Sequence, residues 1–124
     1  MLWKHILLVA LGGSVGSVTR FLCNKLISNS SAFPTATLLI NISGCLLIGI
    51  LYGISTKQNY FTPELRLLLM TGFCGGFTTF SAFTLEGMNL LQQQRVLLFL
   101  LYFAASVIFG LTATFVGYWV SQKI

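Results

Sequence analysis

Long intervals without a charged residue are the feature that most constrains this chain. Residues 26–56, 67–85 and 96–122 contain no Asp, Glu, Lys or Arg, and residues 5–19 form a shorter interval before Arg20. A helix needs about 20 predominantly apolar residues to cross the hydrocarbon core of a bilayer. Only 7% of the 124 residues are charged and 56% are hydrophobic, which is too little polar surface to cover a water-soluble domain. We therefore predict a membrane protein.

Four membrane-spanning helices account for nearly the whole chain. We predict the spans near residues 4–26, 35–55, 64–91 and 96–120, with loops at residues 28–31, 56–60 and 92–95. The first span is long enough only if Arg20 lies within the membrane. The result is a single all-α transmembrane domain over residues 1–124. It leaves no room for an extramembrane catalytic domain, so we predict that the protein is not an enzyme.

The titratable side chains form no catalytic or metal-binding pattern. Cys23, Cys45 and Cys74 are isolated from one another in the sequence, and the single histidine, His5, lies beside Lys4 at a helix end. The net charge of +5 comes from basic residues scattered over the helix ends. We therefore expect contact with lipid headgroups of the bilayer and no binding of nucleic acid.

The basic residues are nearly balanced between the two membrane faces. Four spans place Lys4, Lys57, Arg66 and Lys123 on one face, and Lys25, Arg95 and Arg20 toward the other. Chains with one fixed orientation usually carry a clear excess of Lys and Arg on the cytoplasmic side. We therefore expect insertion in both orientations, and pairing of the chain with an inverted copy of itself around a two-fold axis in the membrane plane.

Glycines spaced four apart predict close helix packing. The pairs are Gly12 with Gly16, Gly49 with Gly53, and Gly72 with Gly76. This spacing lets helix backbones approach each other in a membrane, where packing contacts replace the hydrophobic driving force. The pattern supports a compact bundle or a dimer, and by itself it indicates no function.

The middle of the third span is poor material for a continuous helix. Gly75 and Gly76 are adjacent, and Thr78 and Thr79 follow them. We expect the helix to break near residues 75–79, with an uninterrupted glycine-rich crossing as the alternative. A break at membrane depth must be buried in protein or line a wet cavity. It would offer carbonyl oxygens to a cation and a helix N-terminus to an anion.

Aromatic and hydroxyl side chains alternate just beyond the expected break. Phe80 and Phe83 are three residues apart and so share a helix face, with Ser81 between them. The edge of an aromatic ring carries partial positive charge, so these rings could coordinate an anion weakly. Weak binding is what conduction requires. The alternative is that both rings simply face lipid.

The second span carries Asn41 in the middle of its uncharged run, with Thr37 one turn earlier on the same face. A buried amide in hydrocarbon must be paired, and its NH2 group can donate to an anion or to another helix. Both interpretations of Asn41 stay open, an anion donor and an interhelical clamp. Arg20 lies on the glycine-rich face of the first span, where it could pair, extend to the interface or give a vestibule positive potential.

Glu86 is the only acidic residue expected within a span, which makes it a candidate for function. Tyr102 and Ser106 are one helical turn apart on the fourth span and complete a second polar set. The alternative role for Glu86 is to accept hydrogen bonds from Tyr102 or from a backbone break.

Three motifs together resemble the Fluc fluoride channels, also called CrcB proteins. They are GGSVG at residues 12–16 with Arg20, PTATLLIN at residues 34–41 with Gly44, and GFCGGFTTFS at residues 72–81. The resemblance covers all four spans. It implies a fluoride-selective passive channel of a bacterial inner membrane that exports cytoplasmic fluoride down its electrochemical gradient. It also implies an antiparallel homodimer with two pores.

The resemblance implies a role for each candidate residue. Each pore would be lined by Asn41, Phe80 and Phe83, with Thr37 and Ser81 nearby. A polar track would consist of Glu86, Tyr102 and Ser106, and Arg20 would lie near the vestibule. A central structural sodium ion would be held by the backbone carbonyls of Gly75 and Thr78 from both subunits. Two positions depart from the family. Ala82 stands where relatives commonly carry a hydroxyl residue, and Gly110 stands where some carry serine.

Two other functions are compatible with a short four-helix chain. A proton-coupled small multidrug transporter needs a membrane-embedded acid, which such transporters place in the first helix, whereas the first span here has Arg20 and no acid. A scaffold protein without transport activity would need only the glycine motifs. That interpretation leaves Asn41 and the expected helix break unexplained.

Overall fold

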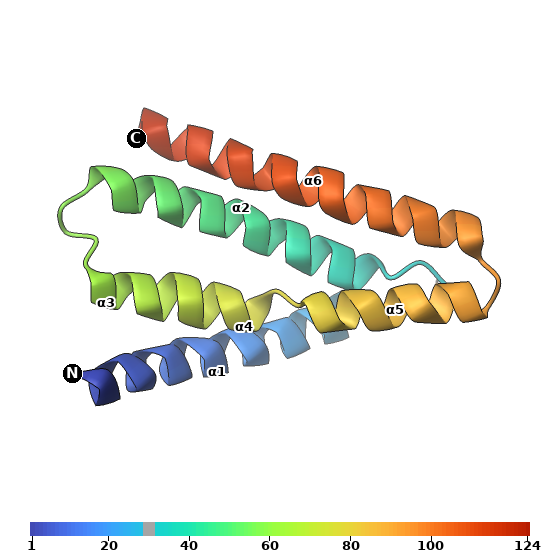
Figure 1. The fold of residues 1–124 in the computed structure, drawn as a ribbon, viewed down its shortest axis with the longest axis horizontal. Helices are drawn as coiled ribbons and strands as arrows, with labels where there is room; N and C mark the ends of the chain where they lie inside the picture. The colour runs from blue at the N-terminus through green and yellow to red at the C-terminus, as the bar shows by residue number, and fades with distance from the viewer. Residues whose placement is uncertain (29–31) are drawn as a thin grey trace.

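Four long helical segments build the structure, a computed structural model that describes residues 1–28 and 32–124 (Figure 1). The segments are Leu2–Ile27 (α1), Thr35–Lys57 (α2), Pro63–Gln92 and Val96–Lys123 (α6). Each is long and apolar enough to cross a membrane, and each contains its predicted range, so the four predicted spans are confirmed. The predicted first loop includes residues 29–31, which lie outside the described residues.

The third segment consists of several helical pieces. It comprises α3 (Pro63–Arg66), the π-helical η1 (Leu67–Cys74), α4 (Gly75–Phe77) and α5 (Phe80–Gln92). The segment begins where Pro63 occupies the first turn and the Thr62 side chain accepts a hydrogen bond from the Leu65 amide. Thr78 and Thr79 have extended backbone angles between α4 and α5. Gly75 and Gly76, in contrast, keep helical backbone.

The helices form two closely packed pairs. α2 lies along α6, and α1 lies along η1 and α4 (Figure 1). Glycine makes both approaches possible, because a Cβ on Gly49 would collide with the Thr114 carbonyl of α6, and a Cβ on Gly16 would collide with the Phe73 carbonyl of η1. The predicted close packing therefore occurs within a single chain.

Both termini lie at the same end of the bundle as the connection between α2 and α3 (Figure 1). Lys4 Nζ is 4.0 Å from Glu64 Oε1, and Lys57 Nζ donates to the carbonyls of Ser121 (3.3 Å) and Gln122 (3.1 Å). The basic residues predicted to share this face are thus brought to one end. Insertion in both orientations stays a prediction.

Few large side chains are buried inside one chain. Among the described residues, the buried apolar side chains are Ile40, Cys74, Phe77, Leu90 and Tyr102, whereas most of the large apolar side chains of α1 and α6 are exposed. An exposed apolar surface of this extent requires lipid or another protein chain to cover it. This exposure agrees with membrane-spanning segments.

The contact between α1 and η1 gives a matched test of glycine packing. A Cβ on Gly12 would meet the Leu68 carbonyl and come within 3.0 Å of Gly72 Cα, whereas a Cβ on Gly13 would find its nearest atom at 3.8 Å. We expect Gly12→Ala to destabilise the protein by about 1–3 kcal/mol because the helices must move apart. Gly13→Ala should have little effect. Thermal unfolding in detergent, followed by circular dichroism, measures both; equal melting temperatures would contradict the packing described here.

Candidate functional site

The interruption between α4 and α5 is held by one side chain of α2. Asn41 Nδ2 donates to the Thr79 carbonyl (3.0 Å), and the Thr79 amide donates to Asn41 Oδ1 (2.8 Å). A single carboxamide therefore pairs with both backbone groups of Thr79, which the broken helix no longer satisfies. Asn41 acts as an interhelical clamp in this structure, and it keeps a second Nδ2 hydrogen for another partner.

Side chains around the interruption satisfy the adjoining helix ends. Thr79 Oγ1 accepts a hydrogen bond from the Ala82 amide (3.1 Å) and caps the start of α5, while Thr78 Oγ1 donates to the Cys74 carbonyl (2.8 Å). Arg20 Nε of α1 donates to the Gly76 carbonyl of α4 (3.1 Å). A cation at the end of a helix is favourable because the terminal carbonyls carry partial negative charge.

Two carbonyls at the interruption lose their usual partners. In a continuous helix the amides of Thr79 and Ala82 would donate to the carbonyls of Gly75 and Thr78. Here these amides donate to side chains of Asn41 and Thr79 instead. Carbonyl oxygens suit hard cations, so the donor set at Gly75 and Thr78 fits a sodium ion. The described residues contain no cluster of three or more His, Cys, Asp or Glu side chains that could hold another metal.

A cavity of about 470 Å³ lies beside the interruption and brings together most of the predicted pore residues. Its lining includes Asn41, Gly75, Thr78, Phe80, Phe83 and Ser106. The rings of Phe80 and Phe83 are 5.7 Å apart between centroids, and Phe80 is 76% exposed, so its ring is not packed into the chain. Ser106 Oγ is buried and has no hydrogen-bond partner among the described residues.

Glu86 of α5 lies at the centre of a second polar cluster. Tyr102 OH of α6 donates to Glu86 Oε1 (3.0 Å), and Thr37 Oγ1 of α2 donates to Glu86 Oε2 (3.0 Å). Thr37 and Tyr102 are buried, and the Tyr102 ring contacts that of Phe83 at 5.1 Å between centroids. The acceptor role for Glu86 that the sequence left as an alternative is therefore present. This cluster adjoins the first cavity through Phe83.

Three residues lie elsewhere than the sequence predicted. Two predicted pore residues, Ser81 and Thr37, do not line the first cavity, and one predicted polar-track residue, Ser106, does line it. Ser81 is exposed on α5, with its Oγ 3.3 Å from Thr79 Oγ1, and it does not line the cavity. Thr37 does not line the cavity either, and its hydroxyl donates to Glu86. Ser106 is one turn beyond Tyr102 on α6 and lines the cavity beside Phe83, not the Glu86 cluster.

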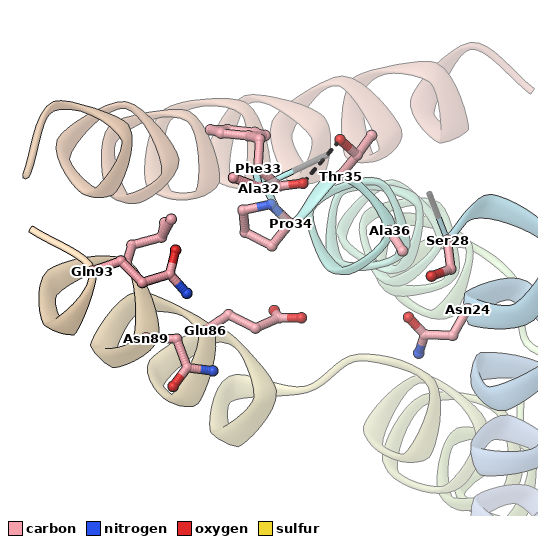
Figure 2. A pocket seen from close by; sticks show the side chains of 11 residues that line it. Asn24, Ser28, Ala32, Phe33, Pro34, Thr35, Ala36, Glu86, Asn89 and Gln93 are labelled. Atoms are coloured by element: carbon pink, nitrogen blue, oxygen red, sulfur yellow. Dashed lines mark hydrogen bonds between the residues drawn. The ribbon is translucent and has the colours of Figure 1, made fainter. Parts of the chain in front are cut away.

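A second, smaller cavity of about 250 Å³ includes Glu86 in its lining and lies among α1, α2 and α5 (Figure 2). Asn24, Ser28, Asn89 and Gln93 line it together with Glu86. None of these four residues was predicted from the sequence to belong to the site. The spacing of Glu86, Asn89 and Gln93 along one face of a helix was the signal that could have found Asn89 and Gln93.

The Tyr102 hydroxyl gives a direct test of the Glu86 cluster. Tyr102→Phe leaves Glu86 Oε1 without its donor in a partly buried place, so we expect a loss of about 1 kcal/mol of stability. Tyr118→Phe is the matched control on the same helix, because the Tyr118 hydroxyl makes no hydrogen bond to any described residue. Thermal unfolding in detergent compares the two variants. Equal melting temperatures would show that the hydrogen bond to Glu86 adds no stability.

Comparison with known proteins finds full-length relatives. Residues 7–118 match the family described as CrcB-like protein, Camphor Resistance (CrcB). The chain is 46% identical over 123 residues to the fluoride-specific ion channel FluC of Flavobacterium psychrophilum, which covers 98% of this chain and 99% of that protein. It is 43% identical over 117 residues to the fluoride-specific ion channel FluC of Azobacteroides pseudotrichonymphae, covering 93% and 94% of the two chains. It is 44% identical over 113 residues to fluoride-specific ion channel FluC 2 of Rhodococcus jostii, covering 91% and 95%.

Proposed function

The chain belongs to the CrcB-like family of multi-pass membrane proteins, as its motifs predicted, and on this premise we propose that it is a fluoride-selective passive channel. The observation that carries the proposal is the similarity, over nearly the full length, to proteins named fluoride-specific ion channels. The matched relatives are channels and not enzymes, in agreement with the prediction from the sequence. The residues around the first cavity support the same function.

The cavity beside the interruption offers donors that suit a small anion. The second Nδ2 hydrogen of Asn41 and the unpartnered Ser106 hydroxyl can each donate to fluoride. The edges of Phe80 and Phe83 add weak positive potential without a fixed charge. An anion that meets only neutral donors and ring edges is held loosely enough to move on, which is the condition for conduction.

The direction of net flux follows from the membrane potential. Fluoride enters a cell as neutral HF from an acidic medium and is trapped as the anion at the nearly neutral pH of the cytoplasm. A passive pore then lets the potential, about 2.3 kcal/mol per charge for each 100 mV, drive the anion outward. Export of fluoride therefore needs no nucleotide and no coupled ion.

Two copies of the chain would complete the channel as an antiparallel homodimer with two pores. The near balance of basic residues between the two ends supports insertion in both orientations. An apolar cavity of about 480 Å³ is lined by residues of α2, η1 and α6, such as Ile48, Met70 and Leu111. Apolar side chains of a second copy could pack against it, which supports a dimer. A two-fold axis in the membrane plane would relate the copies.

A structural sodium ion would lie on that axis, held by the Gly75 and Thr78 carbonyls of both copies. The loss of the helical donors at these two carbonyls supports this placement. The ion would supply positive charge between two anion paths. Arg20 would add positive potential at the vestibule, since its Nε bonds the Gly76 carbonyl and its other guanidinium N–H groups are left for solvent or anion.

Fluoride efflux from proteoliposomes tests the proposal. A fluoride electrode follows release from loaded vesicles after a potassium ionophore relieves the build-up of charge, and chloride-loaded vesicles provide the selectivity control. We expect rapid efflux of fluoride and no measurable efflux of chloride. Vesicles that stay closed to fluoride, with protein correctly folded and inserted, would refute the channel.

Replacing both Phe80 and Phe83 with isoleucine tests the role of the ring edges. We expect fluoride efflux to be abolished while the protein stays folded, because the rings vanish and much of the side-chain volume remains. Phe109→Ile is the control, since Phe109 is an exposed phenylalanine of α6 outside the cavity. Efflux at the wild-type rate in the double variant would remove the rings from the conduction path.

A further inference from the structure

The polar cavity shown in Figure 2 is lined by Glu86 and not by Phe83. Its lining comes from three helices and their ends, which meet at one end of the bundle. Glu86 and Asn89 belong to α5, and Gln93 is the C-cap of that helix. Asn24 and Ser28 lie at the end of α1, and Pro34 lies at the start of α2. Polar groups make up most of its accessible lining, in contrast to the cavity beside the phenylalanines.

The cavity residues of α5 and its C-cap form a row along one helix face. Glu86, Asn89 and Gln93 are three and four residues apart, so they stack on adjacent turns. The row begins at Glu86, which accepts hydrogen bonds from the hydroxyls of the buried residues Thr37 and Tyr102, and runs to the C-cap residue of α5. It therefore leads from the interior of the bundle to its end.

Three carboxamides around the cavity have unused donors. Within the described residues, the side-chain amides of Asn24, Asn89 and Gln93 make no hydrogen bond. Figure 2 shows Asn89 and Gln93 on the α5 side of the cavity and Asn24 on the α1 side, with the Glu86 side chain extending between them. Each NH2 group carries two donor hydrogens, so the three side chains present a neutral set of N–H donors on two walls.

We propose that this cavity is one mouth of the anion path, and that the carboxamides of Asn24, Asn89 and Gln93 receive fluoride there as it exchanges its water shell for protein donors. The inference rests on the proposed channel function and extends it to residues outside the phenylalanine cavity. A passive pore needs an opening at each membrane face. Side-chain contacts connect the linings of the two cavities, because Glu86 lines the polar one and the ring of its partner Tyr102 contacts that of Phe83, which lines the other.

Amide groups are chemically suited to this place. A fixed positive charge would hold a small anion tightly and slow its release, whereas neutral N–H donors replace only part of its hydration. The carboxylate of Glu86 repels an anion that approaches along this face. Donors on both walls offset that repulsion, and each amide can turn its NH2 group toward the anion and its oxygen away.

The test compares fluoride efflux of variants that change these donors. Asn89→Asp keeps the side-chain shape and replaces the NH2 donor with a second negative charge next to Glu86, so we expect efflux to fall about tenfold or more. Gln93→Leu removes a donor without adding charge, and we expect a reduction of about threefold. Gln92→Leu is the matched control, because Gln92 is the neighbouring amide on α5 and does not line the cavity. Its efflux should equal that of the wild type.

A second pair of variants protects the test against misfolding. Asn89→Leu is neutral and keeps the branch at Cγ of asparagine, and Asn89→Gln keeps the amide. We expect slower fluoride efflux with Asn89→Leu and nearly wild-type efflux with Asn89→Gln, in proteins with the same elution volume and melting temperature. This result would support the proposal that the cavity is a mouth of the anion path. Wild-type efflux in the Asp, Leu and Gln93→Leu variants would overturn it while leaving the channel function intact. Absence of fluoride efflux from the wild-type protein would instead overturn the proposed function, and the mouth with it.

Discussion

The pair of hydrogen bonds between Asn41 and Thr79 is the interaction on which the site depends. Two residues of extended backbone in the middle of a membrane span leave amide and carbonyl groups without helical partners, and each such group costs several kcal/mol if it stays unpaired in hydrocarbon. One carboxamide from α2 takes the place of both helical partners of Thr79. Because α5 starts directly after this clamp, the clamp also sets where Phe80 and Phe83 project. The break and the aromatic pair are therefore one structural unit.

Close packing is what brings Asn41 to the break. Gly44 lies one turn after Asn41 on α2, and a Cβ there would collide with the Thr78 side chain. On the opposite side, a Cβ on Gly76 would come within 2.5 Å of the Gly13 carbonyl of α1. The extended segment between α4 and α5 is thus enclosed between α1 and α2, and glycines make this close approach possible. Small residues at these positions allow van der Waals contacts with α1 and α2. These contacts stabilise a segment that has lost its own helical hydrogen bonds.

The four spans could be predicted from the sequence because bilayer thickness fixes the length of each apolar segment. The location of the extended residues was harder to obtain, since intrinsic propensity points at Gly75 and Gly76, which are helical, whereas Thr78 and Thr79 are extended. Helix propensities measured in water do not include the stabilisation of an extended residue by a side-chain amide of a neighbouring helix, which Asn41 supplies to Thr79. Asn41 and Glu86 stood out as polar residues in uncharged or apolar runs. Asn24, Asn89 and Gln93 did not, because amides near helix ends are ordinary at a membrane surface. The helical spacing of Asn89 and Gln93 from Glu86 was a weak signal, and the arrangement of all three amides around one cavity is what distinguishes them.

Glu86 and Ser106 illustrate two ways in which a polar group can be kept inside a membrane protein. Glu86 has a donor on each carboxylate oxygen, so its burial is compensated within the chain. Ser106 Oγ is buried without a partner among the described residues, which costs about 1–3 kcal/mol if nothing else bonds it. A permanent protein partner would remove that cost and would also occupy the donor. In the proposed channel, a hydroxyl left free beside Phe83 is satisfied only while an anion or a water passes, so the same unpaired group lowers the barrier for permeation and holds no ion in place.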